Sequence, residues 1–368
     1  MSSSSLYIHI PFCGKKCLFC SFSVAVNQAN YVNAYLKALR QEALRYQGTR
    51  LSTLYIGGGT PSFLSEEQID ALFVLVSEQF MREDGCEVTF ECNPESVTES
   101  KARLLRRCGV TRVSLGIQSM RDRILTSLGR AHSQEDAERA FSFLRSAGHE
   151  NISVDFMYGM EGQSHEDIDQ DLADMIRLGS EHVSIYALTV EERSLLFVRK
   201  GQTPGAGDAD LYEGICSFLE NAGISQYEIS NFSRASFESR HNINYWQGGE
   251  YIGLGMAAHS HVAGRRFWNQ DTLSKYLNAI SQEGHAVVGE ERLTPKDKMI
   301  EVLLFSLRMN RGINLDDLQK RFHADIPPEK IEVMESFIEM GLLEEDGMVL
   351  RTTVRGRSVL DEISARLV

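Results

Sequence analysis

The stretch Tyr7-Ile-His-Ile-Pro-Phe-Cys13-Gly-Lys-Lys-Cys17-Leu-Phe-Cys20 is the starting point for interpreting this chain. Its first half is rich in β-branched and aromatic residues, which predicts a strand over 6–10. Three cysteines in C-x3-C-x2-C spacing follow directly. Thiolates this close in sequence can bind three irons of a cubane and leave the fourth iron without a protein ligand. The stretch therefore predicts an iron–sulfur site on the loop after a strand.

Two other uses of these cysteines remain open at this stage. Zinc could be held by the three thiolates and a histidine such as His9. Alternatively, Cys17 and Cys20 have the spacing of a dithiol redox pair. Structural zinc sites usually pair two ligand knuckles, however, and a redox pair does not need Cys13. The chain has seven cysteines, and this odd number argues against a disulfide framework.

Short β-like runs alternate with amphipathic stretches over the first two-thirds of the chain. The predicted strands are 6–10, 53–56, 87–91, 112–115, 152–156 and 182–186. Ser65, followed by Gln68, and Ser133 are predicted helix caps, and a further helix is predicted over 165–178. Six strand-then-helix units predict an α/β fold, a partial (β/α)6 TIM-like barrel with parallel strands. Its working face would lie at the carboxyl ends of the strands.

The rest of the chain predicts two further parts. Residues 208–292 are less regular, with a helix over 211–221 and a Gly-rich stretch over 253–261. Beyond them, helices are predicted over 295–308, 315–321 and 329–340, then a hairpin over 343–353 that turns at Asp346-Gly347, and a last helix from Gly356. This order resembles a winged helix. We expect three domains, 1–207, 208–292 and 293–368.

Charge and composition narrow the function classes. The 368 residues are 42% hydrophobic and 24% charged, as in ordinary soluble globular proteins. The net charge of −13 argues against nucleic acid as the main partner, and so do the glutamates of the predicted recognition helix, at 329, 332, 335 and 339. The sequence shows neither a secretory signal nor an apolar run of the ~20 residues that span a membrane. We expect a cytoplasmic protein.

Four more motifs accompany the cysteine loop in order: Gly57-Gly-Gly-Thr60-Pro61, Glu91-Cys-Asn-Pro94, Val113-Ser-Leu-Gly-Ile-Gln118-Ser119 and Asp155-Phe-Met-Tyr-Gly159. Together they resemble the oxygen-independent coproporphyrinogen III oxidase-like family of radical-SAM proteins over essentially the whole chain. The resemblance implies that Cys13, Cys17 and Cys20 ligate a [4Fe–4S] cluster whose open iron binds S-adenosylmethionine (SAM). It also implies a cofactor-binding set of Tyr7, Phe19, Gly58, Gly59, Thr60, Glu91, Gln118, Arg130, Asp155 and Ala187.

These residues also have plainer explanations. A glycine triplet after a strand can be a tight turn, a carboxylate at a strand end can cap the next helix, and Phe19 can be a packing residue. One position departs from the family's oxidase, which carries a fourth cysteine two residues beyond the triplet, where this chain has Phe22. The departure favours the branch of HemW-type haem chaperones. We therefore do not expect coproporphyrinogen dehydrogenase activity.

His241-Asn-Ile-Asn-Tyr245 has the H-N-x-x-Y pattern of the haem-binding segment in that branch. Imidazole and tyrosinate are both known haem ligands, so His241 and Tyr245 are the expected haem contacts. A hydrogen-bonded structural histidine is the alternative for His241, and His259 and His261 are alternative ligands.

We therefore expect a haem chaperone that delivers haem to an apo-haemoprotein, with a respiratory-chain acceptor as one candidate. An oxidoreductase or methyltransferase acting on a porphyrin, and a metal-binding interaction protein without turnover, are the rival interpretations. The expected partners also include an electron donor for the cluster, a second copy in a homodimer and a peripheral membrane contact.

Overall fold

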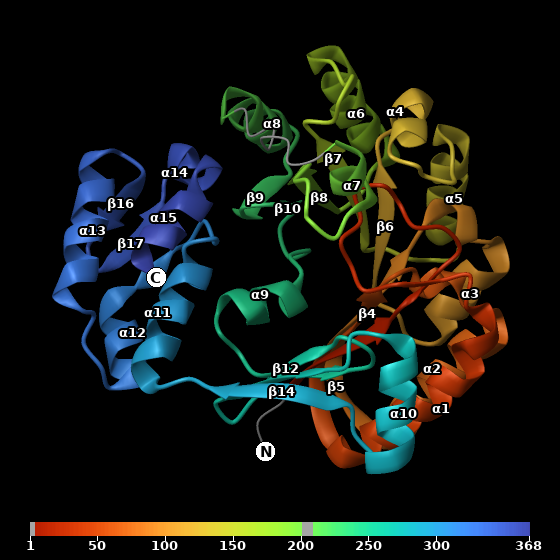
Figure 1. Cartoon of the computed structure of the whole chain (residues 1–368). Helices are drawn as coiled ribbons and strands as arrows, with labels where there is room; N and C mark the ends of the chain where they lie inside the picture. The colour runs from red at the N-terminus through yellow and green to blue at the C-terminus, as the bar shows by residue number, and fades with distance from the viewer. Residues whose placement is uncertain (1–3, 201–208) are drawn as a thin grey trace. The chain divides into compact units, whose positions relative to one another are not determined.

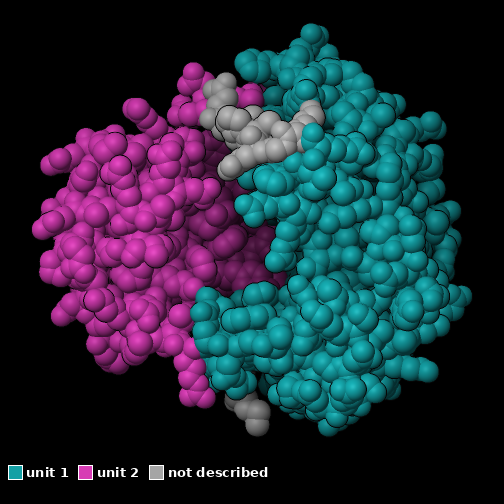
Figure 2. All heavy atoms as spheres, in the orientation of Figure 1, with its two compact units in different colours: residues 1–206, 250–291 teal, residues 207–249, 292–368 magenta. Residues whose placement is uncertain are grey.

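The computed structural model describes residues 4–200 and 209–368, and the chain divides into two compact units. Unit 1 holds residues 1–206 and 250–291, and unit 2 holds residues 207–249 and 292–368 (Figure 1; teal and magenta in Figure 2). The segment expected as a middle domain is thus shared between the two units, and its expected boundary at 207/208 lies outside the described residues. The expected division into three domains stays a prediction.

Unit 1 is built on parallel strands, each found where the sequence predicts one. They are β1 Ser4–Ile10, β4 Thr49–Gly58, β5 Phe80–Cys92, β6 Arg112–Gln118, β7 Ile152–Tyr158 and β8 His182–Ala187. They lie side by side in chain order, and each pairs in parallel with the next. The expected α/β class and strand-then-helix order are confirmed. β1, β4 and β5 begin earlier than predicted, and β4 to β8 end later than predicted.

Helices connect these strands and lie along the outside of the curved sheet (Figure 1). They are α1 Val32–Ala43, α2 Glu66–Gln79, α3 Glu99–Arg107, α4 Asp122–Ser127, α5 Gln134–Ser146 and α6 His165–Leu178. A further helix, α7 Leu195–Lys200, follows β8, and its Leu196 amide donates to the Leu18 carbonyl of the cysteine loop at 2.7 Å. Ser65 and Ser133 form the predicted caps, each in a capping box with the residue three positions on.

The two faces of the parallel sheet differ in polarity. Along β1, the residues Leu6, Ile8 and Ile10 are fully buried, whereas the alternating positions are Ser5, Tyr7 and His9. The register places Tyr7 beside Tyr55, Glu91 beside Ser114, and Asp155 beside Ser184. Because neighbours in register share a face, one face of the sheet is apolar and packs in the core, and the other carries polar side chains.

The sheet continues beyond β1, where the sequence shows little regularity. The added elements of unit 1 are β11 Tyr251–Leu254, β12 His259–Val262, β13 Arg265–Asn269, α10 Leu273–Glu283 and β14 Val287–Arg292. β11 pairs in parallel with β1, and β12 and β13 follow antiparallel. Arg265 and Arg266 on β13 pair with Glu290 and Glu291 on β14. Charged side chains of this kind protect a sheet edge and also obscure the alternation that predicts strands.

Unit 2 has its own apolar core. Its elements are α8 Ala209–Asn221, β9 Ser225–Glu228, β10 Asn231–Ser233, α9 Arg240–Trp246, α11 Pro295–Ser306, β15 Ile313–Asn314, α12 Leu315–Phe322, α13 Pro328–Glu339, β16 Leu343–Asp346, β17 Val349–Thr352, α14 Val354–Ser358 and α15 Leu360–Leu367. The predicted helices and hairpin from 295 onward are confirmed. The sheet β15-β17-β16 completes a winged-helix-like arrangement, and the four predicted glutamates on α13 are exposed.

Among the described residues, no helix combines the length and the apolar character that crossing a bilayer requires.

Candidate functional site

The cysteine loop of unit 1 leaves the sheet at the carboxyl end of β1. Cys13 ends the short strand β2 Phe12–Cys13, which pairs with β3 Ala25–Val26, so both ends of the loop are fixed to each other. All seven cysteines of the chain are free thiols. The Sγ atom of Cys13 lies 3.4 Å from Oγ1 of Thr60, and the guanidinium of Arg130 donates to Sγ of Cys17 at 3.3 Å.

The three thiols lie close enough to affect one another. Burial, with a smaller contribution from the neighbouring Cys20 and Cys17, raises the pKa of Cys13 to about 11, and burial also raises the pKa of Cys20. Since metal ligation requires thiolates, bound iron would supply the positive charge that this loop otherwise obtains only from Arg130 and its lysines. The donor set therefore fits an iron–sulfur cluster.

A single-ion site makes a different geometric demand from a cubane. Over residues 4–200 and 209–368, no group of three His, Cys, Asp or Glu side chains lies close enough together to hold a single metal ion. A cubane needs no such convergence, because each thiolate binds its own iron. His9, the candidate fourth zinc ligand, accepts from the Tyr7 hydroxyl at Nδ1 and donates from Nε2 to the Ser23 carbonyl, both at 3.0 Å. Burial lowers the pKa of His9, which favours this neutral form.

The glycines at the carboxyl end of β4, Gly58 and Gly59, allow the cysteine loop to approach the sheet. A Cβ atom at Gly58 would lie 2.5 Å from Nδ1 of His9, and one at Gly59 would lie 2.9 Å from Sγ of Cys13. Gly58 also has a φ of +115°, which disfavours other residues. These close contacts with the protein itself explain both glycines. The expected contacts of Gly58, Gly59 and Thr60 with SAM stay predictions.

Glu91 lies near the end of β5 on the polar face of the sheet. The Tyr55 hydroxyl donates to its Oε1 at 2.7 Å, and the Gly58 amide donates to its Oε2 at 3.0 Å. Burial raises the pKa of Glu91 to about 7, because the hydrogen bonds only partly offset the loss of solvation and Asp155 adds negative charge. A carboxylate in this setting is an acceptor that a cationic or hydroxyl-bearing ligand would stabilise.

Asp155 lies on the same face, on β7. The Ser114 hydroxyl lies 3.0 and 3.1 Å from its two oxygens, and burial raises its pKa. Arg112 is the buried cation among these groups, and it donates to Nδ1 of His182 at 3.2 Å. Glu91 and Asp155 are therefore two acceptors on neighbouring parts of one polar face, partly balanced by one guanidinium.

The other predicted contact residues lie at the same ends of the strands. Arg130 donates to the Gly116 carbonyl at 2.6 Å, and a Cβ atom at Gly116 would lie 3.1 Å from the Gln118 side chain. Ala187 ends β8 and is half-buried. Phe19 packs against an apolar group that includes Ile124 and Leu128 of α4, so its packing explanation has direct support.

The predicted haem segment forms α9 in unit 2. Ser239 caps this helix by accepting from the Asn242 amide. His241 is 1% exposed, and its Nε2 lies 3.0 Å from the Tyr245 hydroxyl. The two rings meet edge to face, with centroids 4.9 Å apart. The structure thus pairs the two expected haem contacts. It places the alternatives His259 and His261 on β12 of unit 1, where His259 stacks on Trp268.

Sequence reasoning missed several residues of the polar face, among them Tyr55, Arg112 and His182. They occur at alternating positions of predicted strands, and a polar residue at every second position of a parallel strand was an available signal. It also missed the contact between Arg130 and Cys17, residues 113 positions apart in the chain.

Comparison with known proteins agrees with this architecture. The sequence model of the Radical SAM superfamily matches residues 7–175, and that of the HemN C-terminal domain matches residues 293–359. Among solved structures, coproporphyrinogen III oxidase (HemN) from Escherichia coli superposes with a TM-score of 0.87 over 99% of this chain and 90% of that one. At 23% identity, this likeness shows the fold alone.

Curated relatives extend the match over nearly the full length. The heme chaperone HemW of Bacillus subtilis is 32% identical over 98% of this chain and 97% of its own. HemW of Mycobacterium tuberculosis is 32% identical over 97% of this chain and 93% of its own. A radical SAM domain carries a [4Fe–4S] cluster and SAM, which agrees with the thiols and the polar face described above. The chain belongs to the HemW family of the radical SAM superfamily.

Proposed function

We propose that this protein is a haem chaperone, which binds haem through α9 and transfers it to an apo-haemoprotein. The observation that carries the proposal is the pairing of His241 with Tyr245 on one short helix. The relatives that match this chain over nearly their whole length are named haem chaperones. A histidine and a tyrosine on adjacent turns present two ligand types suited to haem iron.

The cluster forms the second part of the proposal. Cys13, Cys17 and Cys20 are the three protein ligands, and SAM completes the fourth iron. A reduced cluster held by these thiolates would supply one electron for chemistry on SAM. On the polar face, Glu91 and Asp155 accept from ligand hydroxyl or ammonium groups, Gln118 offers both donor and acceptor, and Arg130 contributes positive charge. Tyr7, the glycines, Thr60, Phe19 and Ala187 line the same site.

Haem binding at α9 requires a local rearrangement. Nε2 of His241 cannot bond to iron while it is hydrogen-bonded to the Tyr245 hydroxyl, and the imidazole is almost completely buried. Haem must therefore displace the hydroxyl from Nε2, and the freed phenol becomes available as a second contact. Arg240, which precedes this pair and is exposed, is suited to a propionate.

Phe22 separates this proposal from porphyrinogen oxidation. Its side chain occupies the position of the oxidase's fourth cysteine, offers no ligand atom and is 63% exposed. We therefore expect no anaerobic conversion of coproporphyrinogen III to protoporphyrinogen. Turnover of that substrate would overturn the choice of a chaperone.

The experiment that tests the proposal is haem transfer. Wild-type protein loaded with haem should pass it to a haem-free acceptor, followed by the Soret band of the acceptor. His241→Ala should weaken haem binding at least tenfold, and Tyr245→Phe should change the spectrum of the complex. His259→Ala and His261→Ala are the matched controls and should bind within twofold of wild type. Unchanged affinity in His241→Ala, with loss in either control, would move the site to β12.

The partners follow from the same chemistry. A cycle that reduces the cluster needs a one-electron donor, and transfer needs an apo-haemoprotein, for which a respiratory-chain protein is our candidate. A homodimer and a peripheral membrane contact complete the proposed set, and size-exclusion chromatography and vesicle sedimentation test them separately.

A further inference from the structure

The turn after β6 is strained at a residue of the proposed cofactor site. Gln118 has a φ of +74°, a left-handed conformation that residues with a Cβ atom rarely adopt. Such a conformation is strained and persists only where its surroundings hold it. Gln118 is also one of the polar residues around Gly116, together with Arg130. A residue that stabilises this turn therefore also affects the geometry of the proposed cofactor site.

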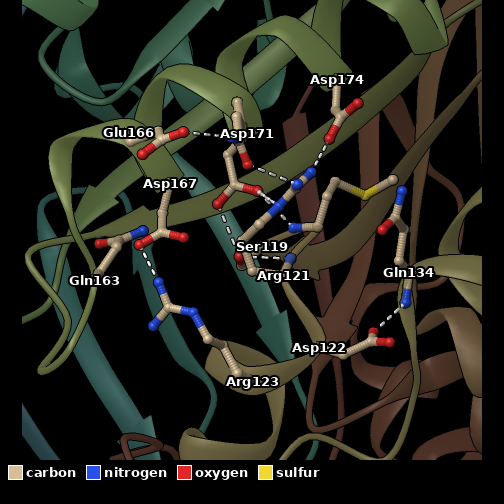
Figure 3. A network of polar contacts seen from close by, with 12 residues as sticks. Ser119, Arg121, Asp122, Arg123, Gln134, Gln163, Glu166, Asp167, Asp171 and Asp174 are labelled. Carbon is tan, nitrogen blue, oxygen red and sulfur yellow. Dashed lines mark hydrogen bonds and ion pairs between the residues drawn. The ribbon is translucent and has the colours of Figure 1, made fainter.

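Asp171 on α6 holds the turn from behind. Its Oδ1 accepts from the Met120 amide at 2.7 Å, and its Oδ2 accepts from the Ser119 hydroxyl at 2.7 Å (Figure 3). Ser119 in turn accepts from the Arg121 amide at 3.1 Å. Asp171 is 3% exposed. One buried carboxylate thus binds the two residues directly after Gln118.

Arginines at the start of α4 fix this helix to α6. Arg121 pairs with Asp171 at 3.4 Å and with Asp174, and it donates to Gln170 at 3.0 Å. Arg123 pairs with Asp167 and donates to the Gly162 carbonyl at 2.6 Å. Figure 3 shows Asp167, Asp171 and Asp174 along α6, directed toward the two arginines. These contacts join the start of α4 to α6, and Asp171 is the one of the three carboxylates that also bonds to the turn after Gln118.

The other end of α4 supports the cysteine loop. The Leu18 amide, between Cys17 and Cys20, donates to the Leu128 carbonyl at 3.0 Å. Ile124 and Leu128 belong to the apolar group against which Phe19 packs. Two residues beyond Leu128, Arg130 donates to Sγ of Cys17 at 3.3 Å. A short helix of six residues thus connects the carboxylates of α6 to the proposed cluster ligands.

We infer that Asp171 is a positioning residue of the cluster and SAM site: it holds the left-handed turn at Gln118 and, through α4, sets Leu128 and Arg130 against the cysteine loop. Asp171 lies outside the set that contacts the cofactors and acts through Gln118 and Arg130. The inference rests on the proposed function for the identity of the ligand, but the mechanical coupling belongs to this chain alone.

The test compares Asp171→Ala and the milder Ser119→Ala with two controls. Asp174→Asn removes a carboxylate that pairs with Arg121 but makes no bond to the turn. Leu172→Ala removes a buried neighbour on the same helix, so it destabilises the fold without touching the network. Two readouts apply: hydrogen exchange of the loop peptide 14–20 in metal-free protein, and SAM affinity from the electron paramagnetic resonance (EPR) spectrum of the reduced, reconstituted cluster.

We expect Asp171→Ala to speed exchange at the Leu18 amide and to weaken SAM binding at least tenfold. Ser119→Ala should act in the same direction with a smaller effect, and Asp174→Asn should stay within twofold of wild type. The inference would be overturned if the Leu18 amide of Asp171→Ala exchanged at the wild-type rate. It would also be overturned if Leu172→Ala, at the same thermal stability as Asp171→Ala, lost as much SAM affinity. Absence of a cluster in wild-type protein would instead overturn the proposed function, while the exchange comparison would still test the coupling.

Discussion

At the scale of single residues, the hydrogen bond from Arg130 to Cys17 places a permanent positive charge beside a proposed cluster ligand. Hydrogen bonds to the sulfurs and nearby charge are main determinants of iron–sulfur reduction potentials. A guanidinium that donates to a ligand sulfur stabilises the more negative, reduced state of the cluster. In the proposed site, Arg130 would therefore help to set how easily the cluster accepts an electron.

The prediction at this scale is a lower reduction potential in Arg130→Gln. Loss of about 1.4 kcal/mol of electrostatic stabilisation would shift a one-electron couple by about −60 mV. A redox titration monitored by EPR measures the shift. Arg103→Gln is the matched control, since it removes an exposed arginine of α3 that pairs with Glu99 on the same helix. Equal potentials in Arg130→Gln and wild type would show that the contact has no electronic effect.

The sequence predicted single residues well where a residue type and a strand end were sufficient. Glu91 ends one predicted strand and Asp155 lies next to the end of another, and the structure places both on the polar face. Asp171 and Tyr55 could not be predicted in the same way. A carboxylate inside a helix and a tyrosine inside a strand acquire their roles only from residues brought near by the fold, Ser119 for Asp171 and Glu91 for Tyr55.

At the scale of elements, Glu42 joins three parts of unit 1. This residue of α1 accepts from the Gly255 amide after β11, the Asn269 side chain on β13 and the Tyr276 hydroxyl on α10, at 2.9, 2.6 and 2.8 Å. Caps and parallel strands were predictable because their signals are local. The attachment of β11 to β1 was not predictable, since it depends on the long-range bonds of Glu42 and on strands whose edges carry charges.

Burial raises the pKa of Glu42 to about 7, which predicts a pH dependence of stability. A carboxyl whose folded-state pKa lies above its unfolded value stabilises the fold at low pH, and this contribution is lost as pH rises through about 7. At about 1.4 kcal/mol per pKa unit, the loss amounts to about 3 kcal/mol between pH 4.5 and 8.

Denaturant unfolding of metal-free protein at several pH values measures this effect. Glu42→Gln cannot titrate, so its free energy of unfolding should fall less steeply over the same range. The control Glu78→Gln alters an exposed ion pair with Arg40 and should keep the wild-type slope. Parallel curves for wild type and Glu42→Gln would contradict the assignment.

At the scale of the whole molecule, each unit has a core of its own. The core of unit 2 includes Met299, Leu303, Leu307 and Phe337, all buried among residues of the same unit. The helix-and-hairpin order of this part was predictable from sequence. The division of 208–292 between the two units was not, because the chain leaves unit 2 at 249 and returns at 292 without a compositional break.

Leu303→Ala should therefore destabilise unit 2 selectively. Truncation of this fully buried side chain should cost about 2–5 kcal/mol. Hydrogen exchange should rise across 295–367, while the peptides of β1 and β4 to β7 keep their protection. Exchange that rises equally in both units would show that the chain unfolds as a single cooperative body.

The account depends most on a cubane with one open iron on the cysteine loop. The direct measurement is metal and sulfide analysis of anaerobically reconstituted wild-type protein, with EPR of the reduced form before and after addition of SAM. We predict about four iron and four sulfide per chain and a spectrum that changes on adding SAM, both lost in Cys13→Ser, Cys17→Ser and Cys20→Ser. Stoichiometric zinc, no bound metal, or a cluster whose spectrum ignores SAM would contradict the account.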